Sequence, residues 1–138
     1  MTTKKIICVW IGTYNSEKEF YQEYLKFDYE NEDEPTSQFG KDVELEYYDE
    51  DYIESWWFKK LEINNIIQNQ DVLPDSQYFF EELISELKKR DLNALNFITF
   101  LFGEIGTYET NEMLFEYSGM RSTEKPVEFI FKKEYELL

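Results

Sequence analysis

The sequence predicts a single α+β domain in which a small mixed sheet packs against helices. Its 138 residues lie within the usual size of one domain, and 42% of them are hydrophobic, enough for one core. Two short apolar segments have the composition of buried strands, and two longer segments repeat apolar residues at helical spacing. No internal repeat or linker divides the sequence, so residues 1–138 are expected to form one domain.

Two apolar segments are predicted to be the central strands. The run 6–11 is β-branched and apolar on both alternating faces, as expected of a strand covered on both sides, and Gly12 closes it. The aromatic run 95–102 has the same character and is followed by Gly103. We expect central strands near residues 5–12 and 95–102, close to each other.

Two later segments are candidates for further strands. Residues 113–117 fit one of them. Val127, Phe129 and Phe131 alternate with other side chains before a charged stretch, a pattern typical of a less buried strand. The second segment is therefore a candidate edge strand.

Two helices are predicted to pack against the sheet. Ser16-Glu17-Lys18-Glu19 has capping-box spacing and precedes apolar residues at helical intervals, which predicts a helix near residues 16–27. The apolar residues at positions 80, 83, 84 and 87 share one helical face. Lys88-Lys89-Arg90 then complement the dipole of a helix near residues 76–90.

Shorter helices are predicted between these elements. Pro35-Thr36-Ser37 has the residue types of a helix start. Residues 51–57 are predicted to form a second short helix, with Trp56 and Trp57 about 100° apart, one buried and the other partly exposed. Residues 61–73 fit either a helix or a loop.

The charge of the chain restricts its partners. Thirty acids against 14 bases give a net charge of −16, which argues against direct binding of nucleic acid or of an anionic membrane. Nearly a fifth of the residues are aromatic, unlike a disordered acidic chain. A basic protein is therefore the expected partner.

Cysteine use and hydropathy predict a cytoplasmic location. The single cysteine, Cys8, lies in an apolar run and has no second cysteine to pair with. The same run is too short for a signal-peptide core or a membrane span. Cys8 itself is expected to be inert packing rather than a nucleophile.

The residue types give little support for catalysis, and no cofactor or metal is expected. Histidine is absent, which removes the commonest general base and neutral metal ligand, and the glycines do not have the spacing of a phosphate loop. A calcium loop starting at Asp28 fails because Asp33 stands where glycine is needed and Phe39 where glutamate is needed. A carboxylate enzyme remains the least favoured alternative.

The segment from residue 28 to 54 is the strongest candidate for a partner-binding face. It contains twelve acids and the single base Lys41, a local charge of −11, interleaved with aromatic residues. The acids would steer a basic partner, and the aromatics would supply contact energy. The candidate partner-binding residues are Asp28, Glu30, Glu32, Asp33, Glu34, Asp42, Tyr48, Asp49, Glu50, Asp51, Tyr52, Trp56 and Trp57.

Three short motifs resemble the immunity protein 22 family. They are Trp10-Ile11-Gly12, then Ser37-Gln38-Phe39 with Asp42, and Tyr48-Asp49-Glu50-Asp51-Tyr52. The resemblance is best over the first two-fifths of the chain, and Gly40 departs from the family pattern, which has cysteine there.

The resemblance implies an α+β antitoxin without enzymatic activity. Members of the family are described as immunity proteins of bacterial polymorphic toxin systems, which bind and neutralise the C-terminal domain of a cognate toxin, often a nuclease. An acidic DNA mimic or a regulatory adaptor that binds a basic host protein is an alternative with the same charge pattern. The oligomeric state, monomer or homodimer, stays open.

Overall fold

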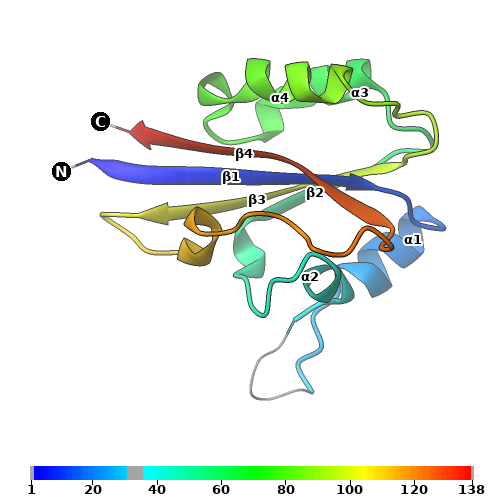
Figure 1. Cartoon of the computed structure of the whole chain (residues 1–138), viewed down its shortest axis with the longest axis horizontal. Coiled ribbons are helices and arrows are strands. Elements are labelled where there is room, and N and C mark those ends of the chain that lie inside the picture. Colours follow the sequence, from blue (N-terminus) through cyan, green and yellow to red (C-terminus); the bar gives the residue numbers. More distant parts are fainter. Residues whose placement is uncertain (1, 31–35, 138) are drawn as a thin grey trace.

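The computed structural model describes residues 2–30 and 36–137. A four-stranded sheet forms its centre, with strand order β2-β3-β1-β4 (Figure 1). All three strand pairings are antiparallel, so the sheet has none of the parallel pairs of a mixed sheet. The strands are β1 (Thr3–Gly12), β2 (Ile53–Trp57), β3 (Phe97–Ile105) and β4 (Val127–Leu137).

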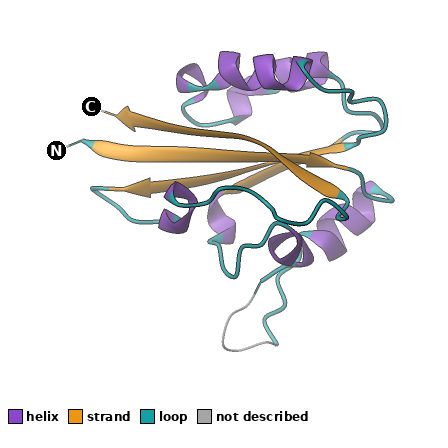
Figure 2. Ribbon diagram, viewed as in Figure 1, coloured by secondary structure: helices purple, strands orange, loops and turns teal. Residues whose placement is uncertain are grey.

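Helices cover both faces of this sheet, which confirms the predicted α+β class (Figure 2). The helix α3 (Ile63–Gln68) and the helix α4 (Phe80–Lys88) lie on one face. The opposite face is covered by α1 (Glu17–Glu19) with the π-helical turn η1 (Phe20–Tyr24), by α2 (Gln38–Asp42) and by the 3₁₀ turn η5 (Glu112–Phe115). Three further 3₁₀ turns are η2 (Glu50–Tyr52), η3 (Gln70–Val72) and η4 (Ser76–Tyr78).

The two predicted central strands are neighbours, as expected. β1 pairs with β3 so that Ile7 lies opposite Phe102 and Gly12 opposite Phe97. Because helices cover both faces, every residue of β1 from Ile6 onward is buried. The predicted edge strand near Val127 is also confirmed, since β4 pairs only with β1 and is longer than expected.

Serine side chains start the two helical segments nearest the N-terminus. Ser16 Oγ accepts a hydrogen bond from the Glu19 N–H at 3.1 Å, as the capping-box spacing predicted. Ser37 Oγ accepts from the Gly40 N–H at 3.0 Å and begins α2. Pro35, the first residue of the predicted helix start, lies outside the described residues.

Two predictions of secondary structure are wrong. Residues 51–57 form the end of η2 and then β2 instead of a helix, because Trp56 and Trp57 each find an apolar layer on opposite faces of the sheet. Residues 113–117 belong mainly to the turn η5 instead of a strand. Asn111 enters that turn with a left-handed φ of 44°, which reverses the chain where a strand would have to continue.

The other helix predictions hold with changed limits. The helix predicted near residues 76–90 is regular from Phe80 to Lys88, preceded by η4. The helix predicted near residues 16–27 comprises α1 and η1 and ends at Tyr24. The ambiguous stretch 61–73 contains both α3 and η3.

Two apolar cores lie on the two sides of the sheet. The core under α3 and α4 is mainly aliphatic, with Ile7, Leu83 and Leu87 fully buried. The core on the other side is aromatic and centres on Trp10, whose ring lies 5.3 Å from Phe39 and 5.4 Å from Phe129.

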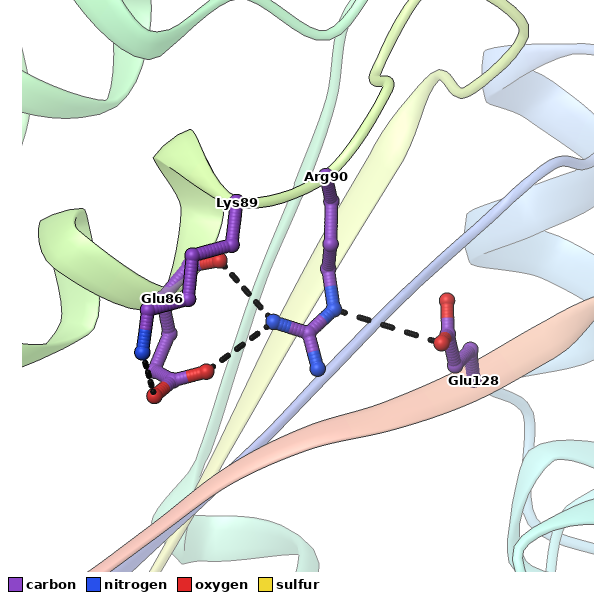
Figure 3. A network of polar contacts seen from close by, with 4 residues as sticks. All are labelled: Glu86, Lys89, Arg90 and Glu128. Carbon is purple, nitrogen blue, oxygen red and sulfur yellow. Dashed lines mark hydrogen bonds and ion pairs between the residues drawn. The ribbon is translucent and has the colours of Figure 1, made fainter.

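A polar network joins the end of α4 to β4 (Figure 3). Arg90 Nη1 donates to the Glu86 carbonyl at 2.9 Å and to Glu86 Oε2 at 3.1 Å, and Arg90 Nε lies 3.9 Å from Glu128. Arg90 and Lys89 together hold the pKa of Glu86 below its usual value. The basic last turn thus caps the carbonyl end of the helix, as its sequence predicted.

Across residues 2–30 and 36–137, none of the helices has the length and apolar character needed to cross a bilayer.

Candidate protein-interaction surface

Carboxylates gather at one end of the sheet, where β2 begins and β3 ends. We call this surface the acidic end. Only Glu44 and Glu104 among its acids have a basic partner within the described residues, namely Arg121 at 3.8 Å and Lys5 at 3.8 Å. The acidic end consists of Glu44, Glu46, Asp49, Glu50, Asp51, Glu54, Glu104, Glu109 and Glu112, with Tyr47, Tyr52 and Tyr108 between them.

Two hollows open on the acidic end, and Thr110 lines both. The larger, of about 610 Å³, is bounded by residues 44, 46, 47, 49 and 109–113, among which there are five acids and no base. The smaller, of about 230 Å³, lies beside Tyr52 and contains Lys5, which is paired with Asp75 at 3.3 Å. The larger hollow is therefore a negative surface in which Glu44, paired with Arg121, is the one acid with a basic partner within the described residues.

The geometry of these carboxylates suits several separate cations. Within the described residues, no three Asp, Glu, Cys or His side chains are arranged to hold one metal ion. Carboxylates spread along a hollow match the separate guanidinium and ammonium groups of a basic protein surface.

Local hydrogen bonds build the first half of the surface. Asp49 Oδ1 accepts from the Asp51 N–H at 3.0 Å and begins η2. This cap turns the chain so that Glu50 and Asp51 are exposed just before β2 starts. Asp49 Oδ2 also lies 3.4 Å from Thr110 Oγ1, which connects η2 to the turn after β3.

Asn111 joins the two halves of the acidic end. Its Oδ1 accepts from the Asp49 N–H at 2.6 Å, and its Nδ2 donates to the Phe102 carbonyl at 2.9 Å. Its side chain is buried, and its left-handed backbone lets the chain turn into η5. One largely buried amide side chain thus positions acids from two distant segments.

A turn after β3 carries the remaining acids and an aromatic pair. Glu104 and Thr110 exchange backbone hydrogen bonds at 2.9 and 3.1 Å, which closes the turn containing Tyr108 and Glu109. The rings of Tyr52 and Tyr108 lie 6.4 Å apart, and Tyr108 is 54% exposed. Hydrogen bonding with Tyr108 raises the pKa of Tyr52 above its usual value.

A comparison with protein families decides the assignment of the chain. The family model described as Immunity protein 22 matches residues 7–136, nearly the whole chain. The chain belongs to this family. The resemblance found in the sequence motifs is therefore confirmed, and the family supports an immunity function. Searches of curated proteins and of solved structures gave no match.

In this Immunity protein 22 member, the predicted partner-binding residues fall into separate groups. Asp49, Glu50, Asp51 and Tyr52 lie together at the acidic end. Asp28 and Glu30 are exposed beside a different, shallow depression that follows η1. The predicted residues Glu32, Asp33 and Glu34 lie outside the described residues.

Two predicted contact residues are buried, which corrects their expected exposure. Asp42 is 5% exposed and accepts hydrogen bonds from Tyr24 Oη at 2.7 Å and from Gln38 Nε2 at 2.9 Å. Tyr48 is 1% exposed, its hydroxyl lies 2.8 Å from Ser37 Oγ, and burial raises its pKa to about 12. Both side chains hold α2 against the aromatic core and are out of reach of a partner.

The two predicted tryptophans also lie away from the acidic end. Trp56 is 9% exposed and packs edge-on against Phe100 at 4.9 Å. Trp57 is half-buried against the aromatic core, and its indole Nε1–H has no acceptor within the described residues. Both tryptophans are at the end of β2, whereas the acidic end lies where β2 begins. Neither is therefore an exposed anchor beside the carboxylates.

Sequence reasoning missed part of the surface. Glu44, Glu46 and Tyr47 belong to the acidic segment but not to the predicted contact residues, and Tyr108, Glu109, Asn111 and Glu112 lie far from that segment in sequence. A signal was present, since residues 104–116 contain four acids and no base. Only folding brings that second acidic stretch beside the first.

Proposed function

We propose that this family member binds and neutralises a cognate bacterial polymorphic toxin domain, and that the acidic end is its binding face. The partner is a basic domain, as nucleases are, because their substrate grooves carry the Lys and Arg side chains that neutralise phosphates. Membership of the Immunity protein 22 family supports the immunity role. The single observation that supports the acidic end as the binding face is the hollow lined by five acids and no base.

Charge explains how the complex would form quickly. The chain carries −16 overall, and the acids of the larger hollow have few internal partners to neutralise them. A basic toxin domain is attracted over distances of about 8–10 Å at moderate salt, and such steering raises association rates toward roughly 10⁸ M⁻¹ s⁻¹. An antitoxin benefits because it must capture the toxin before damage occurs.

The tyrosines explain how the complex would persist. Tyr47 and Tyr108 are 55% and 54% exposed, and Tyr52 stands beside Tyr108. Neutral phenol rings supply apolar area with a hydroxyl at the edge, and they stack on guanidinium groups. Neutralisation then follows because carboxylates occupy the basic groove that would otherwise bind phosphates. The protein acts in the cytoplasm without a cofactor, by binding alone.

Charge reversal at the larger hollow tests the proposal. We would replace Glu46, Glu109 and Glu112 by lysine, since all three are exposed and none forms an ion pair within the described residues. The matched control reverses three exposed acids elsewhere, Asp71, Glu81 and Glu124, and has the same net charge.

The partner in this test is the C-terminal domain encoded by the adjacent upstream gene, with its toxic activity assayed alongside association rates. The Glu46, Glu109 and Glu112 variant should associate at least about tenfold more slowly at low salt, with a flatter salt dependence, whereas the control stays near wild type. Equal association rates for both variants would show that the acidic end is not the binding face. A domain that neither binds nor is inhibited would favour an acidic adaptor for a basic host protein.

A further inference from the structure

The two outer edges of the sheet are treated differently. On β2, Tyr21 covers the edge, since its hydroxyl donates to the Ser55 carbonyl at 3.0 Å and accepts from the Trp57 N–H at 3.1 Å. One side chain thus satisfies outward backbone groups that would otherwise pair with another strand. β2 is also short, so this edge is closed.

The other edge belongs to β4, and its backbone directions follow from one hydrogen bond. The Thr13 N–H donates to the Pro126 carbonyl at 2.9 Å, so the odd-numbered residues of β1 direct their backbone groups toward β4. In the β1–β4 register, Ile7 lies opposite Lys133 and Lys5 opposite Tyr135. The backbone groups of the alternate residues 132, 134 and 136 therefore point away from the sheet.

These outward groups have no partner within the described residues. No hydrogen bond joins the backbone of residues 132, 134 or 136 to any other element. The register shift between Val9 and Trp10 limits the regular edge to the second half of the strand. Figure 1 looks onto this edge, with β4 crossing in front of β1.

The lysines that would usually guard such an edge are occupied elsewhere. Lys132 Nζ donates to the carbonyls of Phe115 at 2.9 Å and Tyr117 at 2.8 Å. Lys133 Nζ donates to Glu82 on the opposite face at 2.6 Å. Lysine deters edge pairing only while its charge faces an incoming strand, so the occupied lysines leave this edge open.

The remaining charges along this edge are acidic. Glu134 and Glu136 are exposed on one face of the strand and form no ion pair within the described residues. A strand added beside them would place its side chains opposite these carboxylates at every second position.

We propose that the outer edge of β4 binds an extended segment of a partner protein by strand addition, and that the segment carries Lys or Arg at alternate positions. Backbone hydrogen bonds to residues 132, 134 and 136 would supply affinity, and Glu134 and Glu136 would select basic side chains. The inference goes beyond the proposed function, because the outer edge of β4 lies on the other side of β1 from β3 and β2, whose ends carry the acidic end.

A second copy of the chain is a poorer occupant than a basic segment. A two-fold pairing of β4 centred on residue 132, 133, 134 or 136 places two identical charged side chains opposite each other. A pairing centred on Tyr135 places Glu134 opposite Glu136 of the second copy. Like charges directly opposite destabilise a strand pair, and two chains of −16 also repel.

The test uses the whole chain and a synthetic ten-residue peptide in which lysine alternates with valine. Titration at low salt is followed by amide NMR, with an alternating glutamate–valine peptide as the matched control. The basic peptide should shift and protect the amides of residues 132, 134 and 136 from exchange, whereas the acidic peptide should not. Absence of these changes at peptide excess would overturn the proposal.

Two variants separate backbone pairing from charge. Glu134→Pro removes an outward N–H without removing a hydrogen bond to β1. It should lower the affinity for the basic peptide by about tenfold or more. Glu134→Lys keeps the N–H but reverses the charge, and should lower the affinity for the basic peptide severalfold. If Glu134→Pro disturbs folding by circular dichroism, Glu136→Pro removes the equivalent donor nearer the strand end.

Two outcomes would contradict the strand-addition mechanism. Unchanged binding by a folded proline variant would mean that only side-chain charge holds the peptide. A dimer in sedimentation that Glu134→Pro dissociates would mean that a second copy occupies the edge. The Glu46, Glu109 and Glu112 charge reversals should leave peptide binding intact, so failure here and failure of the proposed function are distinguishable.

Discussion

Asp49 and Asn111 are hydrogen-bonded to each other in both directions, although 62 residues separate them in sequence. The Asp49 N–H donates to Asn111 Oδ1 at 2.6 Å, and Asn111 Nδ2 donates to the Asp49 carbonyl at 3.4 Å. The pair connects the acidic segment before β2 to the acidic turn after β3. The acidic end therefore depends on one buried amide as much as on its carboxylates.

Replacing Asn111 by alanine should loosen the acidic end and destabilise the protein. The substitution leaves the Asp49 N–H and the Phe102 carbonyl without their partner and places alanine at a φ of 44°. We expect a loss of about 3 kcal/mol in the free energy of unfolding, measured by urea denaturation. The control is Glu112→Gln, a substitution at the exposed neighbouring residue, which should leave the free energy of unfolding unchanged. An equal loss in the two variants would refute this role for Asn111.

Tyr117→Phe should destabilise the aromatic core without changing its shape. The Tyr117 hydroxyl accepts from Trp10 Nε1 at 3.3 Å and donates to the Val43 carbonyl at 2.7 Å. Removing it leaves two buried polar groups unsatisfied, at a cost of about 1–3 kcal/mol by chemical denaturation. A variant as stable as the parent would show that water replaces the hydroxyl.

Alkaline pH should destabilise the fold through Tyr48. Burial raises the pKa of Tyr48 to about 12 from the ordinary tyrosine value of 10.0, so between these pH values the unfolded chain loses a proton that the folded chain retains. The stabilisation is complete below pH 10 and is lost as pH rises toward 12, by about 3 kcal/mol. Between pH 10 and 12, the melting temperature of Tyr48→Phe should fall less steeply than that of the wild type. Parallel curves of melting temperature against pH would contradict this role of Tyr48.

Gly40→Ala should destabilise α2, chiefly through a clash with Thr36. A Cβ at this position would overlap Thr36 Oγ1, a buried hydroxyl with no hydrogen-bond partner within the described residues, and would lie 3.1 Å from Tyr48 Cε1. We expect a loss of about 1–3 kcal/mol in thermal or chemical unfolding. Adding Thr36→Ala removes the contacting atom and should restore much of the stability; a double variant no better than Gly40→Ala would exclude this contact as the cause.

Tyr108→Ala should weaken toxin binding through dissociation. The exposed ring beside Tyr52 has no role in the core, so folding should be unaffected. Loss of a hot-spot aromatic costs about 2 kcal/mol or more in binding, chiefly as faster dissociation, while the acids keep the association rate. Surface plasmon resonance separates the two rates. Tyr29→Ala, which removes another exposed tyrosine away from the acidic end, is the control.

Sequence periodicity predicted the elements whose apolar pattern has one interpretation. The run 6–11 and α4 fall into this class, because burial on both faces or on one helical face leaves a clear repeat. The pattern around Trp56 and Trp57 has two interpretations, since two adjacent indoles fit a helix or opposite faces of a strand equally well. The sheet position opposite β3 decides between them, and no local pattern contains that information.

The candidate site was predictable only in its first half. Residues 49–52 were recognised from local charge and lie at the acidic end. The burial of Asp42 and Tyr48 was not predictable, because it depends on a hydrogen bond that Asp42 accepts from Tyr24 and one that Tyr48 shares with Ser37, and both form only in the folded chain. Glu109 and Glu112 were missed because tertiary contacts alone bring them to the surface.

Hydrogen–deuterium exchange of the chain, alone and bound to the C-terminal domain of the adjacent toxin, would show whether the acidic end is the binding face. We expect binding to protect residues 44–54 and 104–112, where the acidic end lies, and to leave α3 and α4 unchanged. Protection over α3 and α4 with an unchanged acidic end would contradict this placement of the binding face.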